Sequence, residues 1–442
     1  MILAVTIVFF ILILLYVKNR KMDIISKRVL YCFISIWAVS LVISIWNPID
    51  LYPVSFYTYL LLMINVLSCV LGFSCLKISP RTQSNLDYKK LDASIEAISS
   101  SGLFHFIVIA AIVYSSWIMI QNYQMIIMTQ SLSDVRGLYY EDVEKLYGYG
   151  FVTVRDFILN PLSVIASPLF AYLFYKKKNL ISVLLGIFLI EHASIGGGRI
   201  GYARIFIVFI FVLYCLLTHE PRKKKIRLVG IVAAVFVFLI MAITMLRSGI
   251  TNISVGNVNS NREETVGQIS MYVAGPIAAF DYALKDDYVN KMGGYSYGVC
   301  TFCSVDRFLQ PFLKVINPQR LPASNKFIGF KQDNMISISS ERNSYNALYT
   351  AVLFFYLDFG LLGVIFLPFF FGMVFRYLIK LVYLKNNAAI LSLASWIYVK
   401  FMTSNLDLYF ISYLDILTVI ALLIWINMAS YSPQNNKVIV SE

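Results

Sequence analysis

Long apolar runs separated by short polar segments extend over almost the whole chain, and this pattern predicts membrane-spanning helices. A helix needs about 20 apolar residues to cross a bilayer, whereas a transmembrane barrel shows shorter segments of alternating apolar and polar residues. The expected fold is all-α: a polytopic transmembrane helical bundle in which residues 1–442 form a single integral membrane domain. We predict about eleven spans, near residues 2–17, 29–46, 53–76, 102–121, 161–175, 180–195, 200–218, 228–246, 359–383, 388–406 and 411–430.

The polar segments between the predicted spans differ in their content of basic residues. The loops after the first, third, fifth and seventh spans contain Lys18, Arg20, Lys21, Lys27, Arg28, Lys77, Arg81, Lys89, Lys90, Lys176, Lys177, Lys178, Arg222, Lys223, Lys224, Lys225 and Arg227. Cytoplasmic loops carry such an excess, so we expect the N-terminus outside and the C-terminus in the cytoplasm. The first run has no basic n-region and no small-residue cleavage site, so we expect a span rather than a cleaved signal peptide.

The composition agrees with a membrane protein and excludes several function classes. Of the 442 residues, 59% are hydrophobic and 14% are charged, and the mean hydropathy is +0.72. A soluble globular protein carries about 25% charged residues. The formal net charge of +13 follows from the basic loops, and the chain has no basic soluble domain for binding nucleic acid.

Two predicted outer segments are long enough to form structure of their own: residues 122–160, and the large loop 247–358 between the eighth and ninth spans. Within the large loop we predict a re-entrant or interfacial element near residues 265–285. Its Gly275-Pro276 pair is expected to break any helix. The cytoplasmic loops are short and contain no Walker or dinucleotide-binding sequence, so no nucleotide-binding domain is expected.

A glycine triplet followed by two arginines lies between two apolar runs, in the sequence Ile195-Gly-Gly-Gly-Arg-Ile-Gly-Tyr-Ala-Arg204. Arginine near hydrocarbon costs roughly 2.5–3.5 kcal/mol, so its presence there indicates function. Gly197 and Gly198 allow close backbone approach, and Arg199 at a helix start can bind phosphate oxygens in pairs. Arg204 lies about 140° further round the helix, so the two arginines could flank a diphosphate or line two walls of one cavity.

Other charged residues extend the set of candidates. Arg262 and Arg307 have acidic neighbours, and together with Arg320 they are interpreted as ion-pair partners, whereas Arg247 and Arg342 are weaker candidates for the same anion. Lys400 within the tenth span either faces a polar interior or pairs with an acid such as Asp358. The candidates for a catalytic base are Asp358, Glu264, Asp281 and His192. For Asp358 a helix-capping role, and for His192 a structural role, are the alternatives.

Cysteine and metal chemistry offer little. Four cysteines lie in predicted spans, and Cys300 and Cys303 form a Cys-x-x-Cys in the large outer loop. That pair is either a redox or disulfide pair or two semi-buried thiols. A zinc site would need further ligands, so we predict neither a metal nor a cofactor. Aromatic residues, 15% of the chain, are typical of interfacial belts, although sugar faces also stack on aromatic rings.

The chain resembles the Wzy-type O-antigen and capsular oligosaccharide repeat-unit polymerases of bacteria. The resemblance rests on Gly197–Arg199 at the start of a span, on Tyr272-Val-Ala-Gly-Pro276, and on Asn346 through Asp358-Phe-Gly-Leu-Leu-Gly363. It covers nearly the whole chain in order and topology. It implies a bacterial inner-membrane glycosyltransferase of the broad GT-C kind, independent of metal, whose donor and acceptor are undecaprenyl-diphosphate-linked oligosaccharides.

The resemblance also implies how the reaction would run. The growing glycan would move from its lipid diphosphate to a new lipid-linked repeat unit at the outer face, where no nucleotide sugar is needed. Arginines would stabilise the leaving diphosphate, Arg199 first, then Arg204, Arg247 and Arg342. Membrane lipid, a chain-length regulator and a flippase are the expected partners.

Three other functions compete with this interpretation. A flippase or other transporter for lipid-linked oligosaccharide would also need arginines in a cavity, but the chain shows no internal repeat of the kind used for alternating access. An O-antigen ligase would perform the same chemistry on another acceptor. A non-enzymatic assembly subunit would not need the arginine segment.

Overall fold

The computed structural model is helical in the part of the chain that it describes, where strand-like pairing is confined to one antiparallel bridge between Leu51 and Ser339. The description leaves out residues 80–81, 83–86, 130–146, 149, 178, 196–199, 218–220, 248–254, 320, 326–335, 337, 340–348, 407–417, 421, 423 and 425–442. It also leaves out the side chains of residues 129, 179, 240–247, 255–266 and 268–269.

Six helices among the described residues are long and apolar enough to cross a membrane, which confirms the character of a multi-pass membrane protein. They cover Ile2–Asn19, Ile24–Trp46, Phe56–Cys75, Gly102–Met128, Gly150–Tyr175 and Ala351–Lys385. Shorter apolar helices cover Leu180–Ile195, Ile200–Leu216 and Ala388–Met402. Each predicted span up to residue 406 overlaps a helix, and the one at 411–430 lies mostly outside the described residues. The count of eleven stays a prediction.

The chain forms two compact units, each built from segments distant in sequence. The first unit comprises Met1–Ser79, Arg262–Ile379 and Lys400–Leu417, and the second comprises Pro80–Asn261, Lys380–Val399 and Thr418–Glu442. The single membrane domain expected from the sequence stays a prediction.

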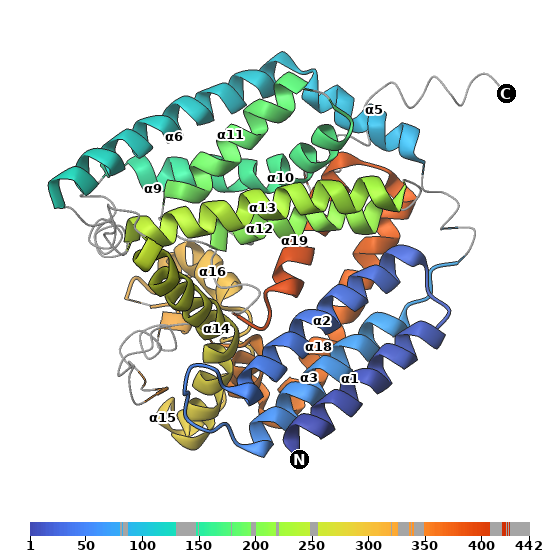
Figure 1. Cartoon of the computed structure of the whole chain (residues 1–442), viewed down its shortest axis with the longest axis vertical. Coiled ribbons are helices and arrows are strands. Elements are labelled where there is room, and N and C mark those ends of the chain that lie inside the picture. The colour runs from blue at the N-terminus through green and yellow to red at the C-terminus, as the bar shows by residue number, and fades with distance from the viewer. Residues whose placement is uncertain are drawn as a thin grey trace. The chain divides into compact units, whose positions relative to one another are not determined.

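The first unit contains four long helices lying side by side: α1 (Ile2–Asn19), α2 (Ile24–Trp46), α3 (Phe56–Cys75) and α18 (Ala351–Lys385) (Figure 1). α3 and α18 approach closely at two glycines, which have no Cβ atom to keep the backbones apart. A Cβ atom added at Gly72 would lie 1.9 Å from the backbone oxygen of Phe369, and one added at Gly372 would lie 2.3 Å from the backbone oxygen of Cys69. Small residues at such positions allow transmembrane helices to pack backbone to backbone.

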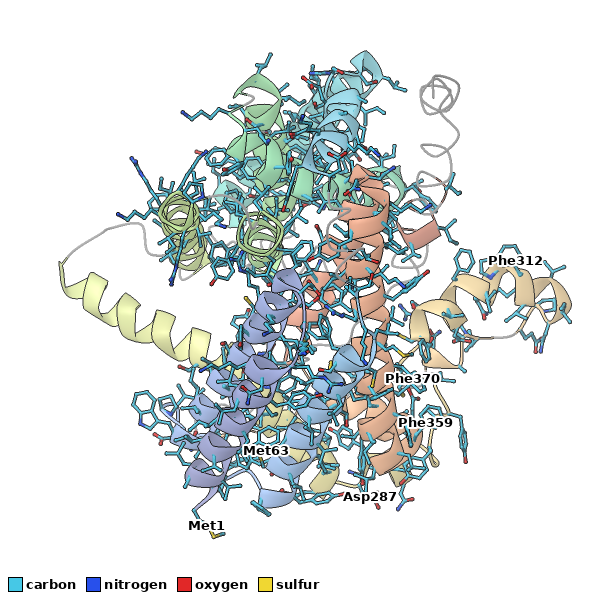
Figure 2. All side chains as sticks on the ribbon, turned by 90° about the vertical axis from the view of Figure 1, so that its right-hand side faces the viewer. Met1, Met63, Asp287, Phe312, Phe359 and Phe370 are labelled. Atoms are coloured by element: carbon cyan, nitrogen blue, oxygen red, sulfur yellow. The ribbon has the colours of Figure 1, made fainter. Side chains whose placement is uncertain are left out.

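The two ends of this unit differ in chemistry. At one end Asp23, Leu76 and Arg376 meet, next to the lysines and arginines that join α1 to α2. At the other end Leu51 bridges Ser339, and α14 (Val255–Lys285) meets the start of α3. Met1 and Asp287 also lie at this second end (Figure 2). The basic loop and the α14 contact are therefore at opposite ends of the unit.

Three features of the fold differ from the expectations. α14 runs through Gly275-Pro276 without a break, because the buried packing of its neighbours, including Ala274 and Ile277, offsets the hydrogen bond that proline removes. Residues 351–358, expected in the outer loop, form the largely buried first part of α18, which continues across a kink at Phe359 and Gly360. The predicted 122–160 loop is shorter, since α6 extends from Gly102 to Thr129.

α16 (Cys303–Ile316) carries an exposed apolar stripe, whereas most residues from Ser270 to Leu284, in the segment expected to be interfacial, are buried. Val305, Leu309, Phe312 and Ile316 recur on one side of it and are 37%, 41%, 63% and 82% exposed. Arg307 and Lys314 lie on the opposite side at helical spacing. Phe312 stands away from the rest of the unit in Figure 2.

The second unit is built from α5 (Tyr88–Ser99), α6, α9 (Gly150–Val154), η1 (Arg155–Leu159), α10 (Asn160–Tyr175), α11 (Asn179–Ile195), α12 (Ile200–Ile210), η2 (Phe211–Leu216), α13 (Arg222–Arg247) and most of α19 (Ala388–Met402). α6, α10 and α11 pack together (Figure 1). η1 and η2 are π-helical turns, which leave out regular α-helical hydrogen bonds and occur often at functional sites.

Candidate functional site

A group of basic side chains gathers at one end of the second unit. His192 in the last turn of α11 lies within electrostatic range of Arg204 on α12 and of Arg155 on η1. Its ring stacks on Phe188 with centroids 5.7 Å apart. Its Nδ1 atom is buried and has no hydrogen-bond partner among the described residues. We call His192, Arg155 and Arg204 the basic corner.

Arg155 is held in place by its own helix. Its Nε atom donates to the carboxylate of Asp156 over 2.7 Å, and its guanidinium lies 5.6 Å from the ring centre of Phe151. Asp156 is 3% exposed and also accepts from Asn160. Because these contacts fall in the π-helical turn η1, the turn fixes where this guanidinium can point. Arg155 was not among the candidates from the sequence, and no local pattern distinguishes it there.

The glycine-arginine turn joins two helices that are tightly apposed. A Cβ atom added at Gly201 would lie 2.9 Å from that of Ala193, and the hydroxyls of Ser194 and Tyr202 share a hydrogen bond. The end of α11 is also tied to α6, because Asn122 donates to the carbonyl of Ile195. Gly197, Gly198 and Arg199 lie outside the described residues, so their predicted roles stay predictions, but both ends of their turn are fixed beside the basic corner.

The opposite end of the second unit carries the lysine-rich loops. Lys176 pairs with Asp92 over 3.0 Å, and Lys225 donates to the carbonyl of Leu217 over 2.8 Å. The Nζ atom of Lys224 lies 4.3 Å from the ring centre of Tyr175. The basic corner and the basic loops are therefore at opposite ends of this unit too.

Asp281 in the first unit, a predicted catalytic candidate, is engaged by four donors. Its Oδ1 accepts from the backbone N–H and hydroxyl of Ser55 and from the hydroxyl of Thr58, at 2.6 Å for Thr58. Its Oδ2 pairs with Lys285 at 2.6 Å. Burial raises the pKa of Asp281, but these hydrogen bonds outweigh it, so the net pKa is below the ordinary value. Asp281 attaches α14 to the N-terminus of α3.

Asp358 is also engaged by the backbone. Its two carboxylate oxygens accept from the N–H groups of Cys300 and Thr301 over 2.9 and 2.7 Å, and its side chain is fully buried. The carboxylate thus closes the 292–302 turn over the end of the helix 351–358. A role as cap fits these contacts directly, and the role as catalytic base stays a prediction.

Neither cysteine of the Cys-x-x-Cys forms a disulfide, and both are fully buried. Burial, and then the nearby Asp358 carboxylate, raise the pKa of the Cys300 thiol well above its ordinary value. A thiol protonated at neutral pH is a poor nucleophile and a poor metal ligand. The structure therefore agrees with the interpretation as two packing thiols.

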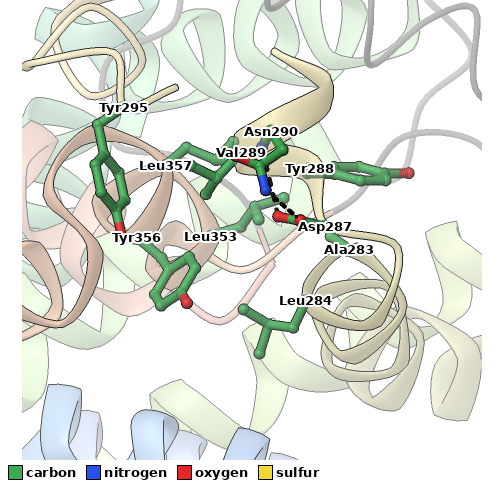
Figure 3. Close-up of a pocket in the computed structure, with 10 residues that line it drawn as sticks. All are labelled: Ala283, Leu284, Asp287, Tyr288, Val289, Asn290, Tyr295, Leu353, Tyr356 and Leu357. Carbon is green, nitrogen blue, oxygen red and sulfur yellow. Dashed lines mark hydrogen bonds between the residues drawn. The ribbon is translucent and has the colours of Figure 1, made fainter. Parts of the chain in front are cut away.

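A cavity of about 220 Å³ lies in the first unit beside these residues. Its lining consists of Ala283, Leu284, Asp287, Tyr288, Val289, Asn290, Tyr295, Leu353, Tyr356 and Leu357. Tyr295 and Tyr356 lie on one side of it, and the hydrogen-bonded pair of Asp287 and Asn290 lies on the other (Figure 3). Leu353 and Leu357 are 1% exposed and form an apolar wall.

The remaining predicted site residues are only partly described. Lys400 is half-buried in α19, and its backbone carbonyl accepts from Thr403. Arg247 is the last residue of α13 and Glu264 lies within α14, but neither side chain is described. Arg342 lies outside the described residues.

One strong electrostatic contact was not expected from the sequence. Arg376 and Asp23 form an ion pair in which both side chains are at most 2% exposed. Arg376 also donates from Nε to the carbonyl of Leu76 over 3.1 Å. The sequence did contain one indication of this pair, because Arg376 lies inside the predicted ninth span and charged residues there normally have a partner or a function.

No family model, no curated protein and no solved structure matches this chain.

Proposed function

We propose that the protein polymerises oligosaccharide repeat units carried on undecaprenyl diphosphate, for an O-antigen or a capsule, at the outer face of the bacterial inner membrane. The observation that carries this proposal is the position of the basic corner. His192, Arg155 and Arg204 gather beside the glycine-arginine turn, at the end of their unit opposite the lysine-rich loops.

The positive-inside rule relates this arrangement to the two sides of the membrane. If the lysine-rich loops are cytoplasmic, the basic corner faces outward, away from ATP and nucleotide sugars. An anion available there at the membrane is a lipid-borne diphosphate. The proposal includes the topology of about eleven spans, with the N-terminus outside and the C-terminus inside, a GT-C-like bundle, and a large outer segment between spans eight and nine.

The transfer step then has a role for each part of the basic corner. An acceptor hydroxyl loses its proton to the imidazole of His192 and its oxygen bonds to the anomeric carbon of the growing glycan. The bond from that carbon to the diphosphate breaks, and the electron pair leaves with the diphosphate. Arg199, with Arg155 and Arg204, stabilises the developing charge, and preorganised groups of this kind can lower a barrier by about 3–4 kcal/mol each.

The acidic candidates are assigned different roles in this scheme. Asp281 and Asp358 are positioning residues, because their oxygens are already used by donors of the chain itself. Glu264, Arg247, Arg342 and Lys400 remain candidates for contact with the glycan or diphosphate.

Deletion of the coding gene tests the proposed function when surface glycan is resolved on a gel. A polymerase mutant retains glycan with a single repeat unit, and the intact gene restores the ladder of longer chains. Loss of all surface glycan would indicate a flippase or a ligase. An unchanged ladder would show that the protein is not needed for making this glycan. Each of these two results would overturn the proposal.

A further inference from the structure

The cavity in the first unit combines aromatic walls, an apolar base and a few polar groups at its rim. Among the lining residues, Leu353, Leu357 and Ala283 are at most 2% exposed, whereas Asp287, Asn290 and Tyr295 are exposed. Small-molecule sites typically have this composition, in which apolar surface gives affinity and a few polar groups fix orientation. The cavity is therefore open to a ligand at its polar side.

Charge at the rim excludes an anionic ligand. Asp287 is the charged residue of the lining, and no described cation pairs with it. The two neighbouring lysines have other partners, because Lys285 pairs with Asp281 and Lys291 pairs with Asp286, each at 2.6 Å. A phosphate or carboxylate would be repelled by the negative charge of Asp287, which no described cation neutralises.

The polar groups offer both donors and acceptors. Asp287 has a left-handed backbone conformation, with φ 49°, and its carboxylate accepts from the side-chain amide and the backbone N–H of Asn290. The Asn290 amide keeps an oxygen acceptor and a second N–H donor, and Tyr295 and Tyr356 add hydroxyls on the facing side (Figure 3). Paired hydroxyls of a sugar need such a mixture, whereas an ammonium ion needs acceptors alone.

The size of the cavity limits the ligand. About 220 Å³ is smaller than the roughly 300–1,000 Å³ of sites for drug-sized molecules. The space suits one ring rather than an oligosaccharide, and the flat faces of Tyr295 and Tyr356 can pack against the C–H groups of such a ring.

We propose that this cavity binds one uncharged pyranose ring, with Tyr295 and Tyr356 against its C–H face and Asp287 and Asn290 holding vicinal hydroxyls. The source of the ring, a glycan on its lipid carrier, rests on the proposed function; the binding itself does not.

Saturation-transfer NMR on the full chain in lipid nanodiscs tests the proposal, with a panel of methyl pyranosides of gluco, galacto, manno, rhamno and 2-acetamido-2-deoxygluco configuration as probes. We expect at least one probe to show transfer to its ring C–H protons. Tyr356→Leu should weaken binding roughly two- to tenfold, the value of one aromatic contact. Asp287→Asn should also weaken binding, because it removes the carboxylate that accepts hydrogen bonds from the sugar hydroxyls.

Tyr297→Leu is the matched control, because Tyr297 lies two residues from Tyr295 in the 292–302 turn but is 78% exposed and lies outside the cavity lining. Tyr356→Phe keeps the ring and should retain most of the transfer, and a single symmetric size-exclusion peak shows that each variant is folded. Absence of transfer for all probes, equal binding by Tyr356→Leu and the parent, or binding of tetramethylammonium in place of the sugars would overturn the proposal.

The two proposals fail separately. If gene deletion leaves single-repeat glycan but no pyranoside binds, the cavity proposal is wrong and the polymerase stands. If a pyranoside binds at the cavity but deletion leaves the glycan ladder unchanged, the binding site stands and the polymerase function is wrong.

Discussion

Arg376 on α18 and Asp23 at the start of α2 form an ion pair in which both side chains are almost fully buried. Asp23 also caps α2, since its Oδ1 accepts from the N–H of Ser26 over 2.9 Å. The guanidinium rests against the ring of Phe73 at 5.4 Å. This one contact joins α2, α3 and α18 at the end of the unit where the basic loop lies.

Arg376→Leu should destabilise the protein strongly, because it leaves the Asp23 carboxylate buried without its partner. Removing one member of a buried pair typically costs about 3–5 kcal/mol. The measurement is the melting temperature of the purified protein in detergent. Lys385→Leu, at an exposed position of the same helix, is the control and should change little.

The double variant Asp23→Asn with Arg376→Leu separates pairing from packing. Asn retains the helix cap and removes the uncompensated charge, so the double variant should be more stable than Arg376→Leu alone. Equal or lower stability of the double variant would show that the arginine acts through packing and not through the pair.

Asp281 should make stability depend on pH in the acid range. Its pKa in the folded protein is lowered in net, since burial raises it but the hydrogen bonds from Lys285, Ser55 and Thr58 lower it by more. The ionised form therefore stabilises the fold fully above the ordinary aspartate pKa of about 3.9, and this contribution is lost as pH falls through the lower folded pKa.

Asp281→Asn should accordingly cost about 1–3 kcal/mol at neutral pH, and the difference from the parent should shrink below about pH 4. Thermal melting across pH 3 to 8 measures this. Asp286→Asn, which breaks only the half-exposed pair with Lys291, should behave like the parent. A difference that stays constant with pH would contradict the role of the charge.

Gly360→Ala should disturb both the kink in α18 and the cavity. Gly360 has φ 59° and ψ −139°, a conformation that costs other residues about 1–3 kcal/mol. An added Cβ would also lie 2.8 Å from the Tyr295 hydroxyl. We expect a lower melting temperature and weaker pyranoside binding.

Gly230→Ala is the matched control, because Gly230 is helical and its added Cβ would meet nothing within 4 Å. Combining Gly360→Ala with Tyr295→Ala should recover only part of the stability, since it relieves the contact but not the backbone conformation. Complete recovery would show that the side-chain contact alone requires glycine at this position.

Arg199→Lys should shorten the surface glycan, because it keeps the charge but removes the planar fork that binds a diphosphate in pairs. We expect at least about a tenfold lower polymerisation rate, equivalent to about 1.4 kcal/mol, measured from the glycan length distribution on a gel. Arg28→Lys in a basic loop is the control. An unchanged ladder for Arg199→Lys would rule out a bidentate role for this residue.

The positions of the long apolar helices could be predicted from the sequence, since the length needed to cross a bilayer is visible in one dimension. The ninth predicted span, 359–383, begins at the observed kink and ends two residues before α18 does. The opposite placement of the basic loops and of Ile195 and Ile200, the helix ends that flank the glycine-arginine turn, was also predictable, because alternate turns in a chain of spans lie at opposite ends of their helices.

The sequence did not reveal the contacts that give individual residues their roles. Pro276 was expected to end a helix, yet α14 continues, because packing around it outweighs the loss of one hydrogen bond. Asp281 and Asp358 were equal candidates for a base, but their donors, Thr58 and Thr301 among them, come from segments 223 and 57 residues away.

The sequence by itself determined that this is a helical, multi-pass membrane protein, because hydrophobic length and composition are properties of the chain alone. Only the tertiary structure decided that Arg155 stands with His192 and Arg204, that Arg376 is paired with Asp23, and that Tyr295 and Tyr356 face Asp287 across a cavity. Those relationships join residues on different helices and turns, and packing sets them rather than local propensity.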